Sequence, residues 1–344
     1  MSSANTINRI AIITSGGDAP GMNAAIRGVV LAAENYGIEV MGFRHGYEGL
    51  LNNDFVKLDR KDVEHILQYS GTIIKSARSE RFRTEEGARE AATNLDAHQI
   101  DAFIVIGGDG SFRGAEHLAN FWEGPIIGIP GTIDNDLFGT DNTIGYDTAV
   151  ETAMDALDKI RDTAEAMDRV FIVEVMGRNA GYIGISSAMA SGAERMILPE
   201  LQKDKPLTVA ALVKHIESVQ RVRGDSSYVM VLCENQWPGG AVRLAEQLED
   251  RLNLPCRPCL LGHVQRGGRP TAMDRILGTR LGVHAVELAR QQKTGVMAGV
   301  TANELSETPF ADTWTQRKKL SEELINIQQS LFNPIKKDRS KSTK

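Results

Sequence analysis

Apolar and polar residues follow two different periods along most of the chain. Short, nearly continuous apolar runs such as Ile100–Ile106 are typical of strands covered on both faces of a sheet. Longer segments such as Gly240–Leu252 repeat apolar residues every three to four positions, which is typical of helices packed on a sheet. We predict strands at Arg9–Thr14, Ile38–Phe43, Ile100–Ile106, Pro125–Ile129, Arg169–Val175, Ser227–Leu232 and Gly295–Gly299. We predict helices at Ala24–Tyr36, Arg60–Tyr69, Thr84–His98, after Ser111 through about Asn120, and at Val150–Ala166, Val209–Val222, Gly240–Leu252, Ala272–Gln291 and Leu320–Leu331. Gly181–Ser191 is predicted to be a small-residue helix or a turn.

This alternation of strands and helices predicts a parallel-rich α/β architecture. A chain of 344 residues is long enough for two domains. With 42% hydrophobic and 24% charged residues, the composition is that of an ordinary globular protein with a normal core.

The net charge and the apolar runs exclude some classes of partner. A net charge of −6 gives no reason to expect nucleic acid or an anionic membrane as a partner. No apolar run approaches the roughly 18–20 residues that span a bilayer, and the polar Met1–Arg9 does not resemble a signal peptide. We therefore expect a cytoplasmic protein, with a basic, disordered tail at 335–344.

The three cysteines suggest a reducing compartment. Cys256 and Cys259 form a CxxC, but no second Cys or His pair follows at the spacing of a zinc site. We interpret these two cysteines as small residues at the edge of a strand.

Three predicted strands end in loops that contain glycine and aspartate: Ser15–Asp18, Gly107–Ser111 and Gly131–Asp136. Glycine after a strand often only serves a tight turn that needs positive φ. In doubly wound sheets, however, such loops gather at the carboxyl ends of the strands and bind ligands there. Their backbone N–H groups and the helix that follows suit phosphate.

The third loop contains the sequence TIDND. In an extended backbone, Asp134 and Asp136 would point to the same side. Two like charges held close are unfavourable unless a cation or a proton-accepting role explains them. We interpret this loop as a phosphoryl-transfer centre.

Several common site types are absent from the sequence. There is no Walker A motif and no HRD or DFG set, and no GxGxxG follows the first strand. Ser15 and Ser111 do not lie in GxSxG elbows, which argues against a serine hydrolase.

Five motifs, in order, carry a resemblance to a known family: TSGGDAPGMNAAIRG, IGGDGS, PGTIDND, VEVMGR and GHVQRGG. From about Ile10 to Leu331 the chain resembles the 6-phosphofructokinases. The resemblance implies two doubly wound, parallel-rich, three-layer α/β domains. The larger, ATP-binding domain would comprise 1–145 and about 265–314. The smaller, fructose 6-phosphate-binding domain would comprise about 146–264 and about 315–334.

The resemblance also implies the reaction and its participants. ATP would phosphorylate the 1-hydroxyl of fructose 6-phosphate with the help of Mg²⁺, in a homotetramer whose subunits share active sites. Asp134 matches the general base, Thr132 a residue that bonds the transferring phosphoryl group, and Arg178 a residue near that group. Asp109 and Asp136 match the Mg²⁺ ligands.

The remaining site residues also come from the resemblance. The nucleotide site would comprise Gly17, Arg78, Ser79, Gly108, Asp109, Gly110 and Ser111. The sugar-phosphate site would comprise Thr132, Asp134, Asp136, Arg169, Met176, Gly177, Arg178, Glu234, Arg257, His263 and Arg266. Arg169 and Arg257 would come from a neighbouring subunit.

Two glycines bear on the phosphoryl donor. Pyrophosphate users of this family carry bulkier residues at the positions of Gly110 and Gly131, which fill the space of the ATP α-phosphate. We expect both positions to be open here, which favours ATP. Lys75 stands where the family usually has glycine, and Ser79 replaces a common aromatic residue near the adenine while Arg83 remains, so the adenine pocket is expected to differ.

The effector site of the family is altered. Arg27, Arg60, Glu194 and Arg223 match its residues, but Leu31 and Asp225 stand at two commonly basic positions. Each charge-assisted hydrogen bond contributes about 1.5–3 kcal/mol. We therefore expect control by ADP or phosphoenolpyruvate to be weak or altered.

Three rival interpretations stay open at this point. One is a pyrophosphate-dependent phosphofructokinase. Another is a non-catalytic sugar-phosphate sensor on the same fold, which would be expected to lack the acids at 109, 134 or 136. The third is an NAD or lipid kinase that shares GGDG, against which TIDND and GHVQRGG argue.

Overall fold

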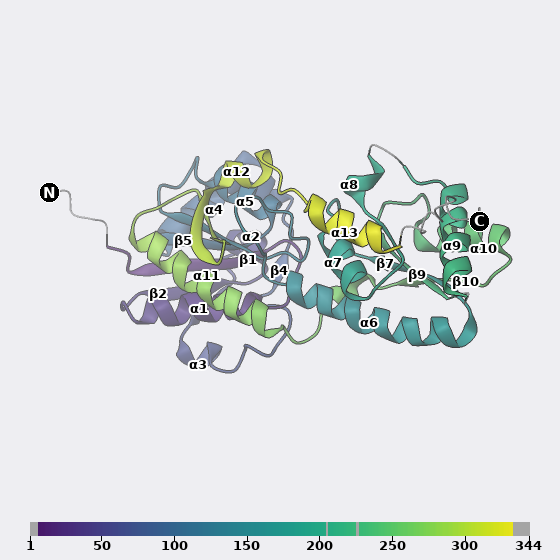
Figure 1. The fold of residues 1–344 in the computed structure, drawn as a ribbon. Helices are drawn as coiled ribbons and strands as arrows, with labels where there is room; N and C mark the ends of the chain where they lie inside the picture. The colour runs from purple at the N-terminus through teal and green to yellow at the C-terminus, as the bar shows by residue number, and fades with distance from the viewer. Residues whose placement is uncertain (1–5, 204–205, 225–226, 333–344) are drawn as a thin grey trace, which may run out of the picture. The chain divides into compact units, whose positions relative to one another are not determined.

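The computed structural model describes residues 6–203, 206–224 and 227–332 (Figure 1). The chain divides into two compact units. Unit 1 comprises Met1–Ala149 and Arg266–Lys318, and unit 2 comprises Val150–Gln265 and Lys319–Lys344. The predicted tail at 335–344 and Asp225 lie outside the described residues.

The sheet of unit 1 has eight strands among the described residues. They are β1 (Arg9–Ser15), β2 (Glu39–Phe43), β3 (Phe55–Leu58), β4 (Ser76–Ala77), β5 (Ala102–Gly107), β6 (Ile126–Pro130), β11 (Val296–Thr301) and β12 (Glu304–Pro309). Their order is β12-β11-β6-β5-β1-β2-β3, with β4 beside the end of β1. The edge strands β3 and β12 are antiparallel to their neighbours, and the other pairs are parallel.

The chain order reverses between β1 and β5. From β1 the chain proceeds to β2 and β3 on one side, and later to β5, β6 and β11 on the other. The carboxyl ends of β1 and β5 therefore flank the crevice where ligands bind in open α/β sheets.

Helices cover both faces of this sheet (Figure 1). One face carries α1 (Met22–Glu34) and α11 (Ala272–Arg290), which lie side by side. Their backbones approach closely at glycines, since a Cβ on Gly282 would lie 2.4 Å from the carbonyl oxygen of Ala25. The other face packs an apolar core that includes Leu50, Leu95, Phe103 and Phe112. The remaining helices of unit 1 are α2 (Gly46–Leu51), α3 (Arg60–Val63), η1 (Arg81–Arg83), α4 (Glu85–Ala97), α5 (Asp109–Leu118) and α12 (Phe310–Thr315).

Unit 2 is built on a fully parallel sheet. Its described strands, in the order β10-β7-β9-β8, are β10 (Cys256–Leu260), β7 (Val170–Val175), β9 (Tyr228–Cys233) and β8 (Arg195–Ile197). The helices of this part of the chain are α6 (Tyr146–Met167), α7 (Tyr182–Ala190), α8 (Pro199–Gln202), α9 (Val209–Arg223), α10 (Gly240–Leu252), η2 (Gly262–Arg266) and α13 (Glu322–Phe332). Every residue of β9 is buried, because β9 lies inside the sheet.

The predicted α/β class with largely parallel sheets is confirmed. The predicted helix at Arg60–Tyr69 is too long, because α3 ends at Val63. The side chain of Asn23 in α1 donates to the carbonyl oxygen of Tyr69 (3.2 Å) and accepts from the N–H of Ile73 (2.9 Å). These tertiary bonds hold residues 69–73 away from a helical path.

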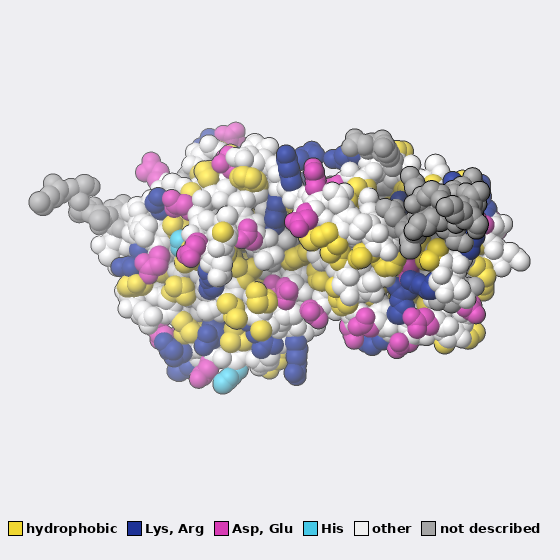
Figure 2. All heavy atoms as spheres, in the orientation of Figure 1, with side chains coloured by type: hydrophobic (Ala, Val, Ile, Leu, Met, Phe, Trp, Pro, Cys, Tyr) yellow, Lys and Arg dark blue, Asp and Glu magenta, His cyan; other side chains and the backbone are white. Residues whose placement is uncertain are grey.

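The surface and the cysteines add little chemistry of their own. Acidic and basic side chains are interspersed over the face shown in Figure 2, as on an ordinary solvated surface. Cys233, Cys256 and Cys259 are free thiols, and the last two lie in the edge strand β10. Within the described residues, no helix is both long and apolar enough to cross a membrane.

Candidate functional site

The loops after β1 and β5 meet at the reversal of strand order in unit 1. The hydroxyl of Ser111, in the first turn of α5, donates to the carbonyl oxygen of Ser15 at 3.1 Å. A Cβ on Gly107 would lie 2.6 Å from the same oxygen, so the close approach of the two loops requires glycine there. The amino end of α5 thus opens next to the glycine loop of β1, an arrangement suited to phosphate.

Arg266 also lies on this part of unit 1. Its Nη1 donates to the carbonyl oxygen of Asp18 at 2.9 Å. A Cβ on Gly17 would lie 2.6 Å from Nη1, so the guanidinium covers the glycine. The structure therefore places Arg266, predicted for the sugar-phosphate site, against the loop predicted for the nucleotide.

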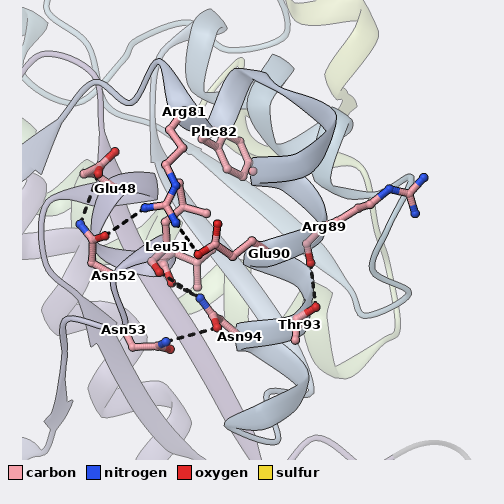
Figure 3. A network of polar contacts seen from close by, with 12 residues as sticks. Glu48, Leu51, Asn52, Asn53, Arg81, Phe82, Arg89, Glu90, Thr93 and Asn94 are labelled. Atoms are coloured by element: carbon pink, nitrogen blue, oxygen red, sulfur yellow. Dashed lines mark hydrogen bonds and ion pairs between the residues drawn. The ribbon is translucent and has the colours of Figure 1, made fainter.

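The segment that carries Arg78 and Ser79 is held to its neighbours by polar contacts of Ser79 and Arg81. The Ser79 hydroxyl donates to Oε2 of Glu48 at 2.6 Å and accepts from the N–H of Phe82 at 3.1 Å. Arg81 donates to Oδ1 of Asn52 at 3.2 Å and forms an ion pair with Glu90 of α4 (Figure 3). The exposed Arg78 is therefore presented by a segment that is fixed to α2 and α4.

Tyr47 joins this segment to α5. Its ring stacks on Phe82 with centroids 3.9 Å apart, and its hydroxyl donates to the carbonyl oxygen of Ser111 at 2.7 Å. Burial raises the pKa of Tyr47 well above its usual value. Tyr47 thereby links the two predicted nucleotide segments from inside the core.

Lys75 has a φ of 59°, in the left-handed region that favours glycine. Its carbonyl oxygen accepts from the hydroxyl of Thr14 at 2.7 Å. The backbone conformation explains why glycine suits this position, and lysine adopts it at the cost of strain.

The backbone of the TIDND loop is not extended. Ile133 and Asp134 lie in a turn, and Asn135 has a φ of 53°. The prediction that alternation along an extended strand aligns Asp134 and Asp136 is therefore wrong. Asp134 is 8% exposed, and its N–H donates to the hydroxyl of Thr132 at 3.3 Å.

The residues before Thr132 are bonded to the glycine loop before α5. The N–H of Gly131 donates to the carbonyl oxygen of Gly107 at 3.0 Å, and a Cβ added to Gly108 would lie 3.7 Å from Cβ of Thr132. The loops after β5 and β6, which are adjacent parallel strands, are thus brought together. This contact joins residues predicted for nucleotide binding to those predicted for phosphoryl transfer.

Only one of the two donor-related glycines faces open space. Apart from its chain neighbours and the backbone of its own helix, no described atom lies within 4 Å of a Cβ added to Gly110. A Cβ on Gly131 would lie 2.8 Å from Cγ2 of Ile106 and 3.0 Å from Cε of Met22. The expectation that Gly131 is open is wrong, because a side chain there would enter the core.

The predicted metal ligands are carboxylates at the same strand ends. Asp109 is the first residue of α5, and its Oδ2 lies 3.9 Å from Nε of Arg113. Asp136 is half-buried. The described residues hold no group of three or more His, Cys, Asp or Glu side chains suited to a metal. Two carboxylates fit Mg²⁺, which keeps several waters and takes few protein ligands.

In unit 2, the predicted sugar residues gather at the carboxyl ends of β7 and β9. Oε1 of Glu234 accepts from the N–H groups of Arg178 (2.7 Å) and Gly177 (3.3 Å). Arg178 has a φ of 55°, and Gly177 a φ of 145°. A carboxylate thus holds a strained turn, as is common at functional sites.

Gln265 supports the same turn and was missed by the sequence reasoning. Its buried Oε1 accepts from the N–H of Met176 at 2.8 Å. Its place in the GHVQRGG motif was the available indication. His263, two residues earlier, is exposed and follows the carboxyl end of β10.

Arg169 and Arg257 lie at the opposite end of this sheet. Arg169 directly precedes β7, and Arg257 pairs with Phe171 near the start of that strand. The turn at Met176 begins seven residues after Arg169, or about 23 Å further along the strand. The structure does not bring these two arginines to the turn within one chain. Arg257 instead donates to Oε2 of Glu249 at 2.9 Å.

The predicted effector residues fall in both units. In unit 1, Arg27 lies in α1, and Arg60, the first residue of α3, pairs with Glu34 at 2.6 Å. In unit 2, the fully buried carboxylate of Glu194 pairs with Arg223 at 2.7 Å. Arg161, which the sequence reasoning missed, pairs with the same carboxylate at 2.8 Å.

Comparisons with known proteins agree on one family. The family model for phosphofructokinase matches residues 9–289. An ATP-dependent 6-phosphofructokinase from Cytophaga hutchinsonii is 47% identical over 326 residues, which cover 94% of this chain and 98% of that protein. ATP-dependent 6-phosphofructokinase 1 from Thermus thermophilus is 47% identical over 325 residues, 94% of this chain and 99% of its own length.

Solved structures are similar as well. The Pichia pastoris phosphofructokinase in the T-state has a TM-score of 0.84 and 34% identity, over 96% of this chain and 38% of that chain. The Saccharomyces cerevisiae phosphofructokinase has a TM-score of 0.82 and 33% identity, over 95% of this chain and 48% of that chain. This chain therefore spans less than half the length of either yeast chain.

Proposed function

The chain belongs to the phosphofructokinase family, and we propose that it transfers the γ-phosphoryl group of ATP to the 1-hydroxyl of D-fructose 6-phosphate. The products are fructose 1,6-bisphosphate and ADP, and the reaction is the committed step of glycolysis, which runs in the cytoplasm. The geometric observation that carries the proposal is the hydrogen bond from the N–H of Gly131 to the carbonyl oxygen of Gly107, at 3.0 Å, between the segments that lead into Thr132 and Gly108. It joins a phosphate-binding helix terminus to a loop with a buried aspartate.

Asp134 is the proposed general base. In this role it takes the proton of the sugar 1-hydroxyl as that oxygen attacks the γ-phosphorus. Phosphoryl transfer depends mainly on positioning and on charge stabilisation, so a single well-placed carboxylate suffices. Thr132 and Arg178 are proposed to bind the transferring group. The hydroxyl of Thr132 accepts from the N–H of Asp134 and supports this assignment by holding the backbone of the turn.

Asp109 and Asp136 are the residues that would hold Mg²⁺. The ion would neutralise negative charge on the phosphate oxygens during transfer. ATP is the co-substrate, and we assign its binding to unit 1. The residues are Gly17, Arg78, Ser79, and Gly108 with the first turn of α5.

Fructose 6-phosphate binding is assigned mainly to unit 2, through the turn at Met176–Arg178 with Glu234 and His263, and to Arg266 of unit 1. Arg169 and Arg257 are proposed to serve the site of a neighbouring subunit. The distance along β7 between Arg169 and Met176 supports this assignment, since Arg169 and the turn at Met176 lie too far apart to bind the same sugar phosphate within one chain. We therefore propose that subunits share active sites, in the homotetramer that the family resemblance implies.

Regulation is proposed to be weak or altered. Arg223, a predicted effector ligand, is already paired with the buried Glu194. A phosphate would have to compete with that carboxylate for the guanidinium. Leu31, half-buried in α1, adds no charge.

The donor is tested by a coupled assay with fructose 6-phosphate, in which ATP and pyrophosphate are compared with and without ADP and phosphoenolpyruvate. We expect turnover with ATP and little with pyrophosphate. Faster turnover with pyrophosphate would refute the ATP assignment. A sigmoidal fructose 6-phosphate curve that micromolar ADP relieves would refute the proposal on regulation.

The base is tested by Asp134→Ala. Loss of a general base lowers kcat by about 10²–10⁴-fold. Asp155→Ala is the control, because the side chain of Asp155 is 71% exposed in α6. Turnover of Asp134→Ala within tenfold of the wild type would show that Asp134 is not the base.

A further inference from the structure

Lys318, the last residue of unit 1, reaches back to the TIDND loop. Its Nζ donates to Oδ1 of Asn135 at 2.8 Å and to the carbonyl oxygen of Asp141 at 2.6 Å. Both acceptors belong to unit 1, so the contact lies within one compact unit. Neither the motif pattern nor the family resemblance singled out Lys318.

Asn135 is the residue through which this contact reaches Asp134. It lies between Asp134 and Asp136, is 3% exposed, and has a left-handed backbone with a φ of 53°. Its Oδ1 also accepts from the N–H of Thr143 at 3.0 Å. The orientation of its side chain depends on these two donors and on its own Nδ2, which donates to the carbonyl oxygen of Asp141 at 3.4 Å.

The other acceptor of Lys318 is itself firmly held. The N–H of Asp141 donates to the carbonyl oxygen of Val300 at 2.7 Å, and its Oδ2 accepts from the N–H of Ala302 at 2.6 Å. Lys318 therefore connects Asn135 to a turn that is fixed on the β11–β12 hairpin. Through Lys318, the movement of Asn135 is restricted by a segment that is itself held by hydrogen bonds.

Lys318 also lies close to carboxylates. Burial lowers the pKa of Lys318 to about 8, while the charges of Asp141 and Asp136 act in the opposite direction. Three aspartates at 134, 136 and 141 concentrate negative charge along one loop, and a nearby cation offsets their mutual repulsion. The residue thus combines two directed hydrogen bonds with a compensating charge.

We propose that Lys318 is a positioning residue for phosphoryl transfer: through Asn135 it holds the TIDND loop in the conformation in which Asp134 meets the sugar hydroxyl. In this role Lys318 acts through Asn135 and not by binding a substrate. Its loss lowers the rate of transfer and leaves substrate binding unchanged. The inference rests on the proposed function of Asp134.

The test is Lys318→Met, with Lys319→Met as the matched control. Lys319 is the next residue, and it is exposed. Because small misplacements of a reacting group cost up to about 10²-fold, we expect kcat of Lys318→Met to fall about 10- to 100-fold. The KM values for ATP and fructose 6-phosphate should stay within about twofold of the wild type, a split that general loss of structure would not produce.

A double-mutant cycle with Asn135→Ala tests the route of the effect. If Lys318 acts through Asn135, Lys318→Met adds little to the loss in that background. A kcat of Lys318→Met less than tenfold below the wild type, a fall matched by Lys319→Met, or additive losses in the cycle would each overturn the proposal. Should Lys318→Met not fold, Lys318→Gln is measured against the same criteria.

The same assays separate this inference from the proposed function. A wild-type protein that forms no ADP in the presence of fructose 6-phosphate refutes the function itself. An active wild type with an unaffected Lys318 variant refutes only the role of Lys318.

Discussion

Replacing Glu194 by glutamine is expected to destabilise unit 2 strongly. The Glu194 side chain is 0% exposed and lies between two arginines that are 19% and 35% exposed. Its oxygens accept from Arg161 (2.8 and 3.2 Å), Arg223 (2.7 Å) and the N–H of Val229 (2.7 Å). Glutamine removes the charge and turns one of these acceptors into a donor that faces other donors.

The magnitude follows from the burial of the pairs. Removing one partner of a buried ion pair costs about 3–5 kcal/mol, because the other charge stays buried without compensation. An exposed pair contributes only about 0.2–1 kcal/mol. The solvent-accessible part of Arg223 places the expected loss toward the lower end of the buried range.

Amide hydrogen exchange measures this loss of stability in unit 2 separately from unit 1. The amides of β9 are buried inside the sheet of unit 2 and are expected to exchange through unfolding of that unit. At about 1.4 kcal/mol per factor of ten, the loss corresponds to exchange about 10²- to 10⁴-fold faster. The amides of β5 in unit 1 serve as an internal reference that should change little.

The control variant is Glu246→Gln, which removes an exposed ion pair with Arg243 at 2.8 Å in the same unit. We expect it to change β9 exchange by less than about fivefold, in line with the small contribution of exposed pairs. If Glu194→Gln behaved like Glu246→Gln, the buried cluster would not hold unit 2 together, and the reasoning from burial would be refuted.

Two further predictions concern backbone strain and pH. Lys75→Gly should stabilise the protein by about 0.5–1 kcal/mol, since glycine relieves about 1–2 kcal/mol of left-handed strain and costs about 0.5–1 kcal/mol in entropy; a lower midpoint in denaturant would contradict this. His215 accepts at Nδ1 from the hydroxyl of Tyr228 (2.8 Å) and donates from Nε2 to the carbonyl oxygen of Phe332 (3.1 Å), a neutral tautomer. Burial, with the Arg195 charge, lowers the pKa of His215. The stabilising effect of neutral His215 is therefore present above about pH 6.5 and is lost as the pH falls through the folded-state pKa. The variant His215→Gln should therefore lose less stability than the wild type between pH 7 and 5. An unchanged slope of stability against pH would show that His215 does not contribute.

Elements with strong local patterns were predictable from the sequence. The helix predicted at Gly240–Leu252 coincides with α10. The helix predicted at Thr84–His98 is α4 with its two flanking residues, and the hydroxyl of Thr84 caps it by accepting from the N–H of Gly87 at 3.1 Å. In these segments the apolar period and the cap act within a few residues, so no distant partner is needed.

Short edge elements were not predictable. The strand β12 is mostly exposed and polar, and it forms because β11 offers it an antiparallel partner. The end of α3 at Val63 was likewise missed, and further along the chain Tyr69 and Ile73 are bonded to Asn23 of α1. Pairing with a remote segment leaves no periodic trace in the local sequence.

The candidate site divides along the same line. The order of the glycine loops and of TIDND in the sequence indicated phosphate chemistry at the ends of the strands. The same motifs indicated the family. The conformations within those loops did not follow from local pattern. Asn135 adopts a left-handed turn that an extended reading of TIDND excludes, and Gly131 packs against Ile106 and Met22 instead of open space.

The sequence by itself thus determined which residue types stand at the ends of which strands, because strand and helix periods and glycine turns are local properties. Only the tertiary structure decided how those residues are held. Lys318 binds Asn135 across 183 residues of chain, and Arg266 binds Asp18, next to Gly17, across 248. Such contacts form when folding brings distant donors to buried acceptors, and the free energy that selects them depends on burial and geometry that no short stretch of sequence contains.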